Sequence, residues 1–338
     1  METKPTDRDV IVKKPRLWRR YLLLSVAGLL FIGLGPYLYS RLAASSRICR
    51  IYSDSDTTPR ASNFDPDSLS VVIFNIAHGR GPVDSNLEEG GQQKRERIQR
   101  IAEFLQQTDA DIIILNEVDF SSTWSGHQNQ AQAIAAAAGY PFRGEQRNLD
   151  FRFIYGSWKF GNAILSRFPI SSSTVIDYPP VRWWEPYLVG KKRGAMFSVK
   201  LPNDQTINVV PVHLEHRSEE ARFESANNII EAVSQNKAPT VVGGDFNSTP
   251  TGMSGTRSVE GLGNTIDLLN RSELLNGPTL EGTDNDFTYP SDEPRIAIDW
   301  IFTTQNSELI EHRVIQSDLS DHLPVLARIR LDSATKTK

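Results

Sequence analysis

Eight polar residues end or flank apolar runs of the sequence, and their types are those that bind metal ions and move protons. The set combines carboxylates, carboxamides and imidazoles. They are Asn75, Glu117, His213, Asp245, Asn247, Asp299, Asp321 and His322. Because the ends of strands meet at one edge of a sheet, side chains far apart in the sequence can converge there. We therefore predict that these residues form one site.

The chemistry that fits this set is metal-assisted phosphoryl transfer. Oxygen-rich ligands suit Mg²⁺ or Mn²⁺, and a phosphodiester needs a cation on its oxygens, an activated water and help for the leaving oxygen. The markers GxSxG and GxxxxGK[ST] are absent, which disfavours serine hydrolases and P-loop NTPases. The single cysteine, Cys49, excludes an internal disulfide and a thiolate zinc cage. The predicted cofactor is Mg²⁺, with Mn²⁺ as the alternative.

The elements that must position these residues are short strands with a few helices. The predicted strands are VVIFN (71–75), DIIILNE (111–117), NAILS (162–166), AMFSVKL (195–201), INVVPVHL (207–214), TVVGGDF (240–246), IAIDWIF (296–302) and VLARIRL (325–331). The predicted helices cover residues 91–107, 127–139 and 218–235. Several strands are consecutive, which favours an α/β sandwich over a strictly alternating nucleotide-binding fold. One domain is expected over residues 67–333, followed by a short tail at 334–338.

Seven motifs occur in an order that is typical of one family. They are IFNIAHGRG (73–81), LNEVD (115–119), GNAILSRFPI (161–170), VHL (212–214), GDFNSTP (244–250), IDWIF (298–302) and SDHLPV (320–325). Each motif is weakly specific, but together they make the chain resemble the endonuclease/exonuclease/phosphatase superfamily, which includes DNase I, abasic-site endonucleases and neutral sphingomyelinases. The resemblance extends from about residue 70 to residue 331.

The resemblance implies a four-layer αββα sandwich of two packed mixed sheets, with the site at one end. It also implies the metal-side residues. Glu117 would be the principal Mg²⁺ ligand, Asp321 a second carboxylate on the metal side, and Asn75 would help to hold metal or phosphate. The family usually has Gln before the metal Glu, whereas this chain has Asn116. We expect this change to leave the ligand intact.

The resemblance assigns the remaining residues to the phosphate and the attacking water. His213 would lie on the phosphate or leaving-group side, and Asn247 would bind a phosphate oxygen. Asp245 would position or deprotonate the water, while His322, oriented by Asp299, would contact the phosphoryl group. A carboxylate that accepts from one imidazole nitrogen favours the cationic imidazole, which suits developing negative charge. Whether Asp245 or His322 takes the water proton stays open at this stage.

A membrane segment precedes the predicted domain. Residues 21–39 contain no charge and would span about 29 Å as a helix, against a hydrocarbon core of about 30 Å. We expect a basic cytoplasmic tail at 1–17, a transmembrane anchor at 18–42 that contacts the lipid bilayer through residues 21–39, and a linker at 43–66. The excess of Lys and Arg on the N-terminal flank predicts a cytoplasmic N-terminus and an extracytoplasmic catalytic domain. A signal peptide cleaved near Ala43 and Ala44 is the alternative.

The charge distribution bears on the substrate. Residues 1–50 contain ten basic and three acidic residues, a net charge of +7, whereas the rest contains 27 basic and 38 acidic residues, a net charge of −11. An acidic body disfavours charge-driven binding to bulk nucleic acid and a role in DNA repair. The predicted partner is a phosphodiester substrate, either phospholipid or nucleic acid, and no obligate protein partner is inferred. A catalytically inactive ectodomain that binds a phosphorylated partner is the alternative function.

Two further features have alternative interpretations. His78 either makes a hydrogen bond within a local turn or lies near the phosphate. The stretch PPVRWWEPYLVGKKRG (179–194) contains Trp183 and Trp184 between basic residues. It either forms a hairpin whose aromatic residues cap the core, or it stacks bases or contacts lipid headgroups.

Overall fold

The computed structural model describes residues 17–43, 48–54, 64–65, 67–153, 156–188, 190–279 and 284–332. Contacts within the chain divide it into two units: one comprises residues 1–44 and 152–155, the other residues 45–151 and 156–338. The expected C-terminal tail, nearly all of the basic N-terminal tail and much of the predicted linker lie outside the described residues.

The first unit contains one long helix, α1 (Leu17–Ala43). Residues Leu17–Ser40 are long and apolar enough to cross a membrane. Length and composition fit the predicted anchor, and they equally fit a signal sequence near the N-terminus. The structure therefore supports an apolar N-terminal helix and leaves its orientation as a prediction.

The second unit contains two mixed sheets. The first has the order β1 (Cys49–Ser53), β4 (Phe142–Phe153), β5 (Gly156–Ser166), β3 (Ile112–Asp119), β2 (Leu69–Asn75), β13 (Val325–Leu331) and β12 (Ser307–Val314). The second has the order β10 (Leu275–Asn276), β11 (Asp299–Thr304), β9 (Thr240–Asp245), β8 (Thr206–His213), β7 (Arg193–Lys200) and β6 (Ile170–Asp177). In each sheet two central strands pair in parallel, β2 with β3 and β8 with β9.

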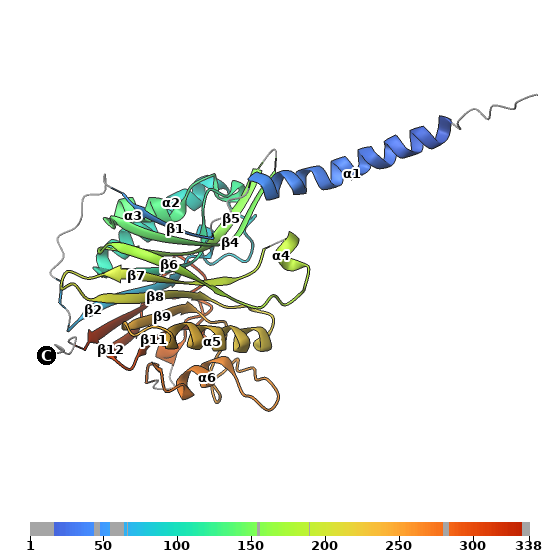
Figure 1. The fold of residues 1–338 in the computed structure, drawn as a ribbon. Coiled ribbons are helices and arrows are strands. Elements are labelled where there is room, and N and C mark those ends of the chain that lie inside the picture. The colour runs from blue at the N-terminus through green and yellow to red at the C-terminus, as the bar shows by residue number, and fades with distance from the viewer. Residues whose placement is uncertain are drawn as a thin grey trace, which may run out of the picture. The chain divides into compact units, whose positions relative to one another are not determined.

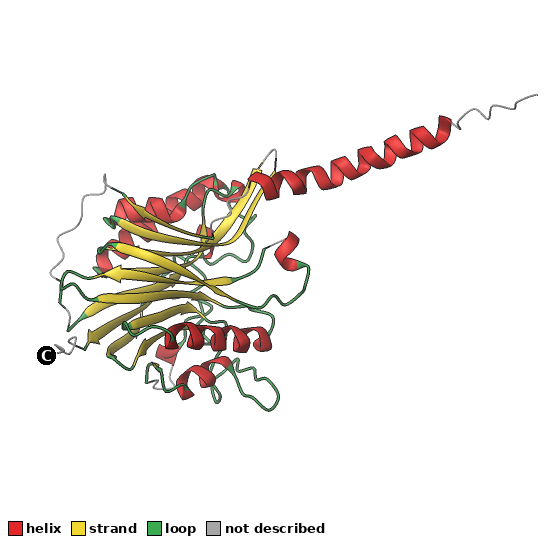
Figure 2. Cartoon of the chain, viewed as in Figure 1, coloured by secondary structure: helices red, strands yellow, loops and turns green. Residues whose placement is uncertain are grey.

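The sheets pack face to face between two layers of helices, as Figure 2 shows. Helices α2 (Gly91–Thr108) and α3 (Gln130–Ala138) cover the first sheet, while α5 (Glu219–Ser234) and α6 (Thr265–Arg271) cover the second (Figure 1). Three apolar clusters fill the spaces between the four layers. The predicted αββα sandwich is confirmed.

Periodicity explains why these segments fold as they do. Along β2, Val72 and Phe74 face the α2–α3 layer, whereas Val71 and Ile73 face the second sheet, so the whole strand is buried. Helix α2 buries residues spaced three or four apart, the pattern that gives a helix one apolar face. Both elements carry site residues or lie against them, so this packing fixes the site.

The apolar runs did not predict every strand. Strand β1 lies within the predicted linker, and it pairs with β4 at the edge of the first sheet. Strands β6, β10 and β12 are likewise edge strands, and β4 contains buried polar residues. An edge strand needs only one apolar face, so its sequence lacks the continuous run by which the central strands are recognised.

Candidate active site

All eight predicted residues lie together at one end of the sandwich, around a cavity of about 500 Å³. Asn75, His213 and Asp245 are the last residues of β2, β8 and β9, and Glu117 lies near the end of β3. Because each of these strands belongs to a parallel pair, the carboxyl ends of the two pairs meet at the cavity. Asp299 starts β11 directly opposite Asp245.

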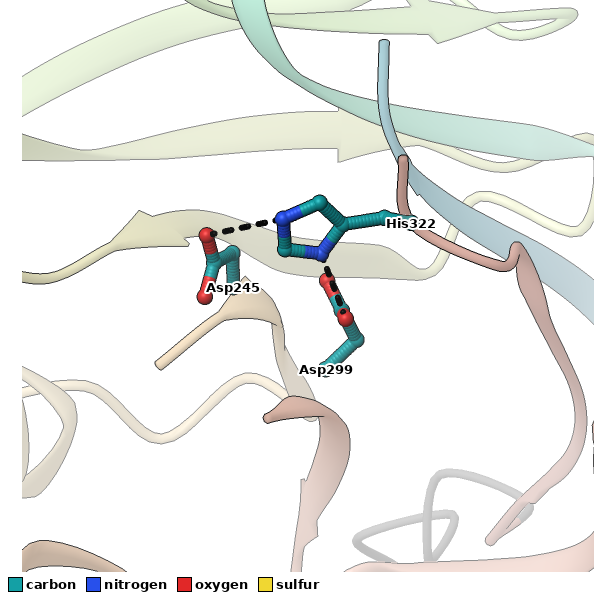
Figure 3. A group of neighbouring side chains, drawn as sticks. All are labelled: Asp245, Asp299 and His322. Carbon is teal, nitrogen blue, oxygen red and sulfur yellow. Dashed lines mark hydrogen bonds and ion pairs between the residues drawn. The ribbon is translucent and has the colours of Figure 1, made fainter. Parts of the chain in front are cut away.

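A histidine lies between two buried carboxylates (Figure 3). His322 Nδ1 donates a hydrogen bond to Asp299 Oδ2 at 2.8 Å, and His322 Nε2 lies 3.9 Å from Asp245 Oδ2. Burial alone would lower the pKa of His322, but the charge and hydrogen bond of Asp299, together with Asp245 and Asp321, raise it to about 10. The imidazole is therefore cationic at neutral pH and presents Nε2–H towards the cavity.

Asp245 is held by a dense set of hydrogen bonds. Its Oδ2 accepts from the side-chain amides of Asn75 at 3.1 Å and Asn247 at 3.2 Å, and its Oδ1 accepts from the Asn247 backbone at 2.9 Å. Its own backbone N–H donates to Asn116 Oδ1 at 3.0 Å, which ties the two sheets together. Burial raises the pKa of Asp245 to about 6, with a further contribution from Asp299. A carboxylate with this pKa is a competent proton acceptor near neutral pH.

Asp245, Asp299 and His322 could by distance alone hold a metal ion, since their donor atoms lie within 4.8 Å of one another. The hydrogen bond from His322 Nδ1 to Asp299 Oδ2 already occupies one donor and one acceptor of the set. These three residues are better suited to proton transfer and to contact with a phosphoryl oxygen.

Glu117 reaches the cavity through an irregularity in β3. The pairing of β3 with β5 shifts between Leu115 and Val118, and Glu117 has a φ of 52°. Such a bulge re-aims a side chain, and it is common beside active sites. Glu117 Oε2 lies 3.4 Å from His78 Nε2 and 3.4 Å from Arg80 Nη1. Burial would raise the pKa of Glu117, but the positive charges of these neighbours lower it below the usual range, so the carboxylate is ionised.

Glu117 and Asp321 fit a hard divalent cation. Arg80 Nη2 donates a hydrogen bond to Asp321 Oδ2, and Arg80 Nε donates to Val83 O at 2.8 Å, so one guanidinium serves both carboxylates. Burial raises the pKa of Asp321. Two carboxylates that share one positive charge beside an open cavity are the oxygen ligands that Mg²⁺ prefers.

Asn75 is placed differently from these carboxylates. Its Oδ1 accepts from the Ala77 N–H at 3.0 Å, and its Nδ2 points to Asp245 Oδ2. The geometry favours a donor role towards Asp245 or phosphate, and the predicted metal contact of Asn75 stays a prediction.

Several basic residues outside the predicted set line the cavity, among them His78, Arg80 and Lys192. His78 lies in a short 3-10 turn, but its ring bonds to Asp119 on β3 and faces Glu117, so the interpretation as a hydrogen bond within a local turn is wrong. Burial would lower the pKa of His78, but its bond to Asp119 outweighs this and raises it. In the sequence, Arg80 is one residue of the HGRG motif and Lys192 belongs to a short basic run, and neither context predicts a place in the site. Their role depends on contacts that no local pattern shows.

Lys192 sets the charge beside His213. Its Nζ donates to Leu214 O, and burial lowers the pKa of Lys192. Burial and the neighbouring Lys192 both lower the pKa of His213 well below its ordinary value, so this imidazole is neutral. The site therefore has a cationic histidine, His322, and a neutral one, His213, facing the same carboxylate, Asp245.

The stretch 179–194 does not cap the core through Trp183. This side chain is exposed, beside the short helix α4 (Glu185–Leu188). Arg182 lies over the Trp184 ring, 5.7 Å from its centroid. The interpretation as a core-capping hairpin is therefore wrong for Trp183.

We expect Asp299→Asn to lower the pKa of His322 by about one to three units, because the substitution removes the carboxylate charge that holds the proton. In the parent the imidazole loses its proton as the pH rises through about 10, and in the variant this loss occurs at lower pH. Titration of the histidine ring by NMR measures the shift. Asp318→Asn, at an exposed carboxylate paired with Arg100, is the control and should leave it unchanged. An unaltered titration in Asp299→Asn would show that Asp299 does not set the charge of His322.

Comparison with known proteins gives a family and a fold. The model of the Endonuclease/Exonuclease/phosphatase family matches residues 72–322. No match is found among curated proteins. An endonuclease/exonuclease/phosphatase from Bacteroides vulgatus is 20% identical with a TM-score of 0.58, and the alignment covers 78% of this chain and 99% of that one.

Two other solved structures share the fold, and their names refer to different compounds. The human Nocturnin catalytic domain with bound sulfate is 18% identical with a TM-score of 0.55, covering 84% and 97% of the two chains. A Bacteroides thetaiotaomicron mannosyl-6-phosphatase is 20% identical with a TM-score of 0.53, covering 78% and 99%. At these identities the likeness shows the fold and leaves the substrate to be argued from the site.

Proposed function

This chain belongs to the endonuclease/exonuclease/phosphatase family and is therefore a hydrolase of phosphoester bonds, and from its site we propose that it is a membrane-anchored, Mg²⁺-dependent phosphodiesterase. The observation that carries the proposal is that a proton acceptor, Asp245, and a cationic imidazole, His322, lie side by side at one cavity. Asp245 has a pKa of about 6 and can accept a proton, while the neighbouring His322 is cationic. Ionised Glu117 lines the same cavity, and its Oε1 lies 3.7 Å from His213 Nε2.

The residues divide the reaction between them. Asp245 Oδ2 accepts the proton of the attacking water, and the amides of Asn75 and Asn247 fix the orientation of this carboxylate. His322 Nε2–H donates to a phosphoryl oxygen whose negative charge grows in the transition state. Neutral His213 holds the phosphate or the leaving side without adding charge.

Glu117 and Asp321 would hold the Mg²⁺, which when bound neutralises negative charge on the phosphoryl oxygens. Mn²⁺ suits the same oxygen ligands and is the alternative. The neighbours His78 and Arg80 keep Glu117 ionised, so this ligand is ready at any physiological pH. Arg80 also donates to Asp321, so one guanidinium holds both carboxylates in place.

The cellular setting of the proposal is a single-pass membrane protein. Helix α1 and the basic N-terminal flank support a cytoplasmic N-terminus, with the catalytic domain of residues 67–333 outside the cytoplasm. A catalytically inactive binding domain is disfavoured, because both the proton acceptor and the metal-side carboxylates are retained and converge. A nuclease is disfavoured by the acidic body.

Removal of divalent metal is expected to abolish turnover of bis(p-nitrophenyl) phosphate, a soluble phosphodiester. The purified full chain would be treated with EDTA and dialysed, and the release of p-nitrophenol would then be measured with and without added Mg²⁺. We expect a loss of at least about 100-fold that added Mg²⁺ reverses, because an electrostatic contribution of this kind supplies several kcal/mol. Turnover that persists after dialysis at the untreated rate would falsify the metal dependence.

A further inference from the structure

Four buried side-chain amides of the first sheet form an unbroken chain of hydrogen bonds, here called the amide chain. They are Asn116 on β3, Asn162 on β5, and Gln146 and Asn148 on β4. Asn116 Nδ2 donates to Asn162 Oδ1 at 3.0 Å, and Asn162 Nδ2 donates to Gln146 Oε1 at 2.7 Å. Gln146 Nε2 in turn donates to Asn148 Oδ1 at 3.0 Å. Three of these residues are fully buried and Asn148 is 6% exposed, so the links replace bonds to water.

Both ends of the amide chain meet backbone N–H groups of the second sheet. At one end the N–H of Asp245, the last residue of β9, donates to Asn116 Oδ1 at 3.0 Å. At the other end the N–H of Arg193, the first residue of β7, donates to Asn148 Oδ1 at 2.9 Å. A backbone N–H can only donate, so the two ends fix which atom of each amide is donor and which is acceptor. The amide chain therefore has one polarity, and it connects β9 with β7 through the first sheet.

The Arg193 end of the amide chain fixes the backbone next to Lys192, which lines the cavity. Gly190, two residues earlier, has a φ of 82°, and a Cβ at this position would lie 2.5 Å from the carbonyl oxygen of Asn148. The segment before β7 is thus packed closely on β4. Lys192 Nζ donates to the carbonyl of Leu214. An ammonium has three N–H groups, so this bond leaves two for a phosphoryl oxygen.

A second, shorter route joins Lys192 to Asp245. The Leu214 carbonyl that accepts from Lys192 also accepts from Asn247 Nδ2 at 3.1 Å, and this amide nitrogen lies 3.2 Å from Asp245 Oδ2. The Leu214 N–H donates to the Asp245 carbonyl at 2.9 Å. Lys192 and Asp245 are therefore linked twice, once through Leu214 and once through the amide chain. A break in the amide chain removes one of the two constraints on their separation.

We propose that Asn162, Gln146 and Asn148 are positioning residues. Through the amide chain they hold the ammonium of Lys192 at a fixed place beside Asp245, where it binds a phosphoryl oxygen of the substrate. This inference rests on the proposed phosphodiesterase function. None of the three residues is among those that line the cavity, so they act through the groups at the two ends of the chain. Displacement of a catalytic group by about 1 Å can lower a rate about 100-fold, which makes such a constraint effective.

A double-mutant cycle with the full chain tests whether Asn148 acts through Lys192. Asn148→Leu keeps the approximate size of the side chain and removes the acceptor of two hydrogen bonds. We expect it to lower kcat for bis(p-nitrophenyl) phosphate about tenfold and to change KM less than about twofold, because the charge is displaced in the transition state. Lys192→Met should lower kcat about 100-fold. Added to Lys192→Met, Asn148→Leu should cost less than a further twofold or so, whereas effects that multiply would overturn the inference.

Two further variants separate positioning from general packing. Asn148→Asp keeps an acceptor for both N–H groups and should retain kcat within about threefold, and a loss equal to that of Asn148→Leu would contradict the role of this acceptor. Asn208→Leu is the matched control. Asn208 is 3% exposed and accepts from Ser198 Oγ at 3.0 Å between β7 and β8, outside the amide chain, so kcat should stay unchanged. Equal losses in Asn208→Leu and Asn148→Leu would reduce the effect to packing and overturn the inference.

Hydrogen exchange of the Arg193 N–H reports on the amide chain without turnover. Gln146→Met breaks two links and leaves Asn148 intact, and it replaces Asn148→Leu in the cycle if that variant does not fold. We expect Gln146→Met to speed exchange at Arg193 about tenfold, because Asn148 is no longer held, with the Phe197 N–H on the same strand as the reference. Unchanged exchange would show that the amides do not act as one chain.

Failure of this inference and failure of the proposed function give different results. A parent protein without metal-dependent turnover of the soluble diester overturns the proposed function, whatever the exchange rates show. A parent protein with such turnover, in which the effects of Asn148→Leu and Lys192→Met multiply, overturns the positioning role and leaves the proposed function standing.

Discussion

Glu117→Gln is expected to reduce turnover of bis(p-nitrophenyl) phosphate at least about 1000-fold and to weaken Mn²⁺ binding at least about tenfold. The substitution keeps the shape of the side chain and removes its charge. In the parent protein, His78 and Arg80 hold Glu117 ionised, and its carboxylate faces the cavity. A neutral amide offers a much weaker ligand to a hard divalent cation.

Two measurements separate a metal effect from a folding effect. Calorimetry with Mn²⁺ gives the affinity independently of turnover, and a thermal melt reports the stability of the fold. Glu311→Gln is the control, because Glu311 lies on the edge strand β12 and pairs with the exposed Arg313 and Arg328. Unchanged Mn²⁺ affinity in Glu117→Gln, with or without lost turnover, would remove Glu117 from the metal site.

Asp245→Asn is expected to lower kcat/KM by about 100- to 10 000-fold, the usual contribution of a general base. In the parent protein the rate should rise as the pH passes through about 6, because Asp245 must lose its proton before it can accept one from water. The rate should fall again near pH 10, where His322 loses its proton. The variant should lose the limb near pH 6 and keep the alkaline one.

The pH profile distinguishes chemistry from packing in this variant. An amide at position 245 still accepts from the Asn247 backbone, but it disturbs the bond from Asn75, so part of the loss is structural. A purely structural loss would lower the rate at every pH and leave the limb near pH 6 in place. That result would contradict the assignment of Asp245 as the proton acceptor.

The central strands could be predicted from the sequence, and the edges could not. Residues 71–75 read as a strand because four of the five positions are apolar, and in the structure the strand is buried on both faces. Residues 325–331 are apolar except for Arg328 and Arg330, which are exposed in the structure. The edge strand β6 buries only Ile170 and Ile176 and is rich in serine, so it carries no continuous apolar signal.

The same physical reason explains which residues of the site could be predicted from the sequence and which could not. Residues such as Asp245 and His213 directly end buried strands, and a polar residue that ends an apolar run can be found by inspection. Arg80 and Lys192 lie on loops, where local sequence does not show which carboxylate a long side chain will reach. The left-handed backbone at Glu117 likewise depends on the shifted pairing with β5.

The sequence by itself determined the family, the central strands and the identity of the acids, amides and imidazoles, because these are recorded in residue types and in periodicity. The tertiary structure alone decided their charges. His322 is cationic and His213 neutral although both are buried histidines, since one contacts Asp299 and the other lies beside Lys192.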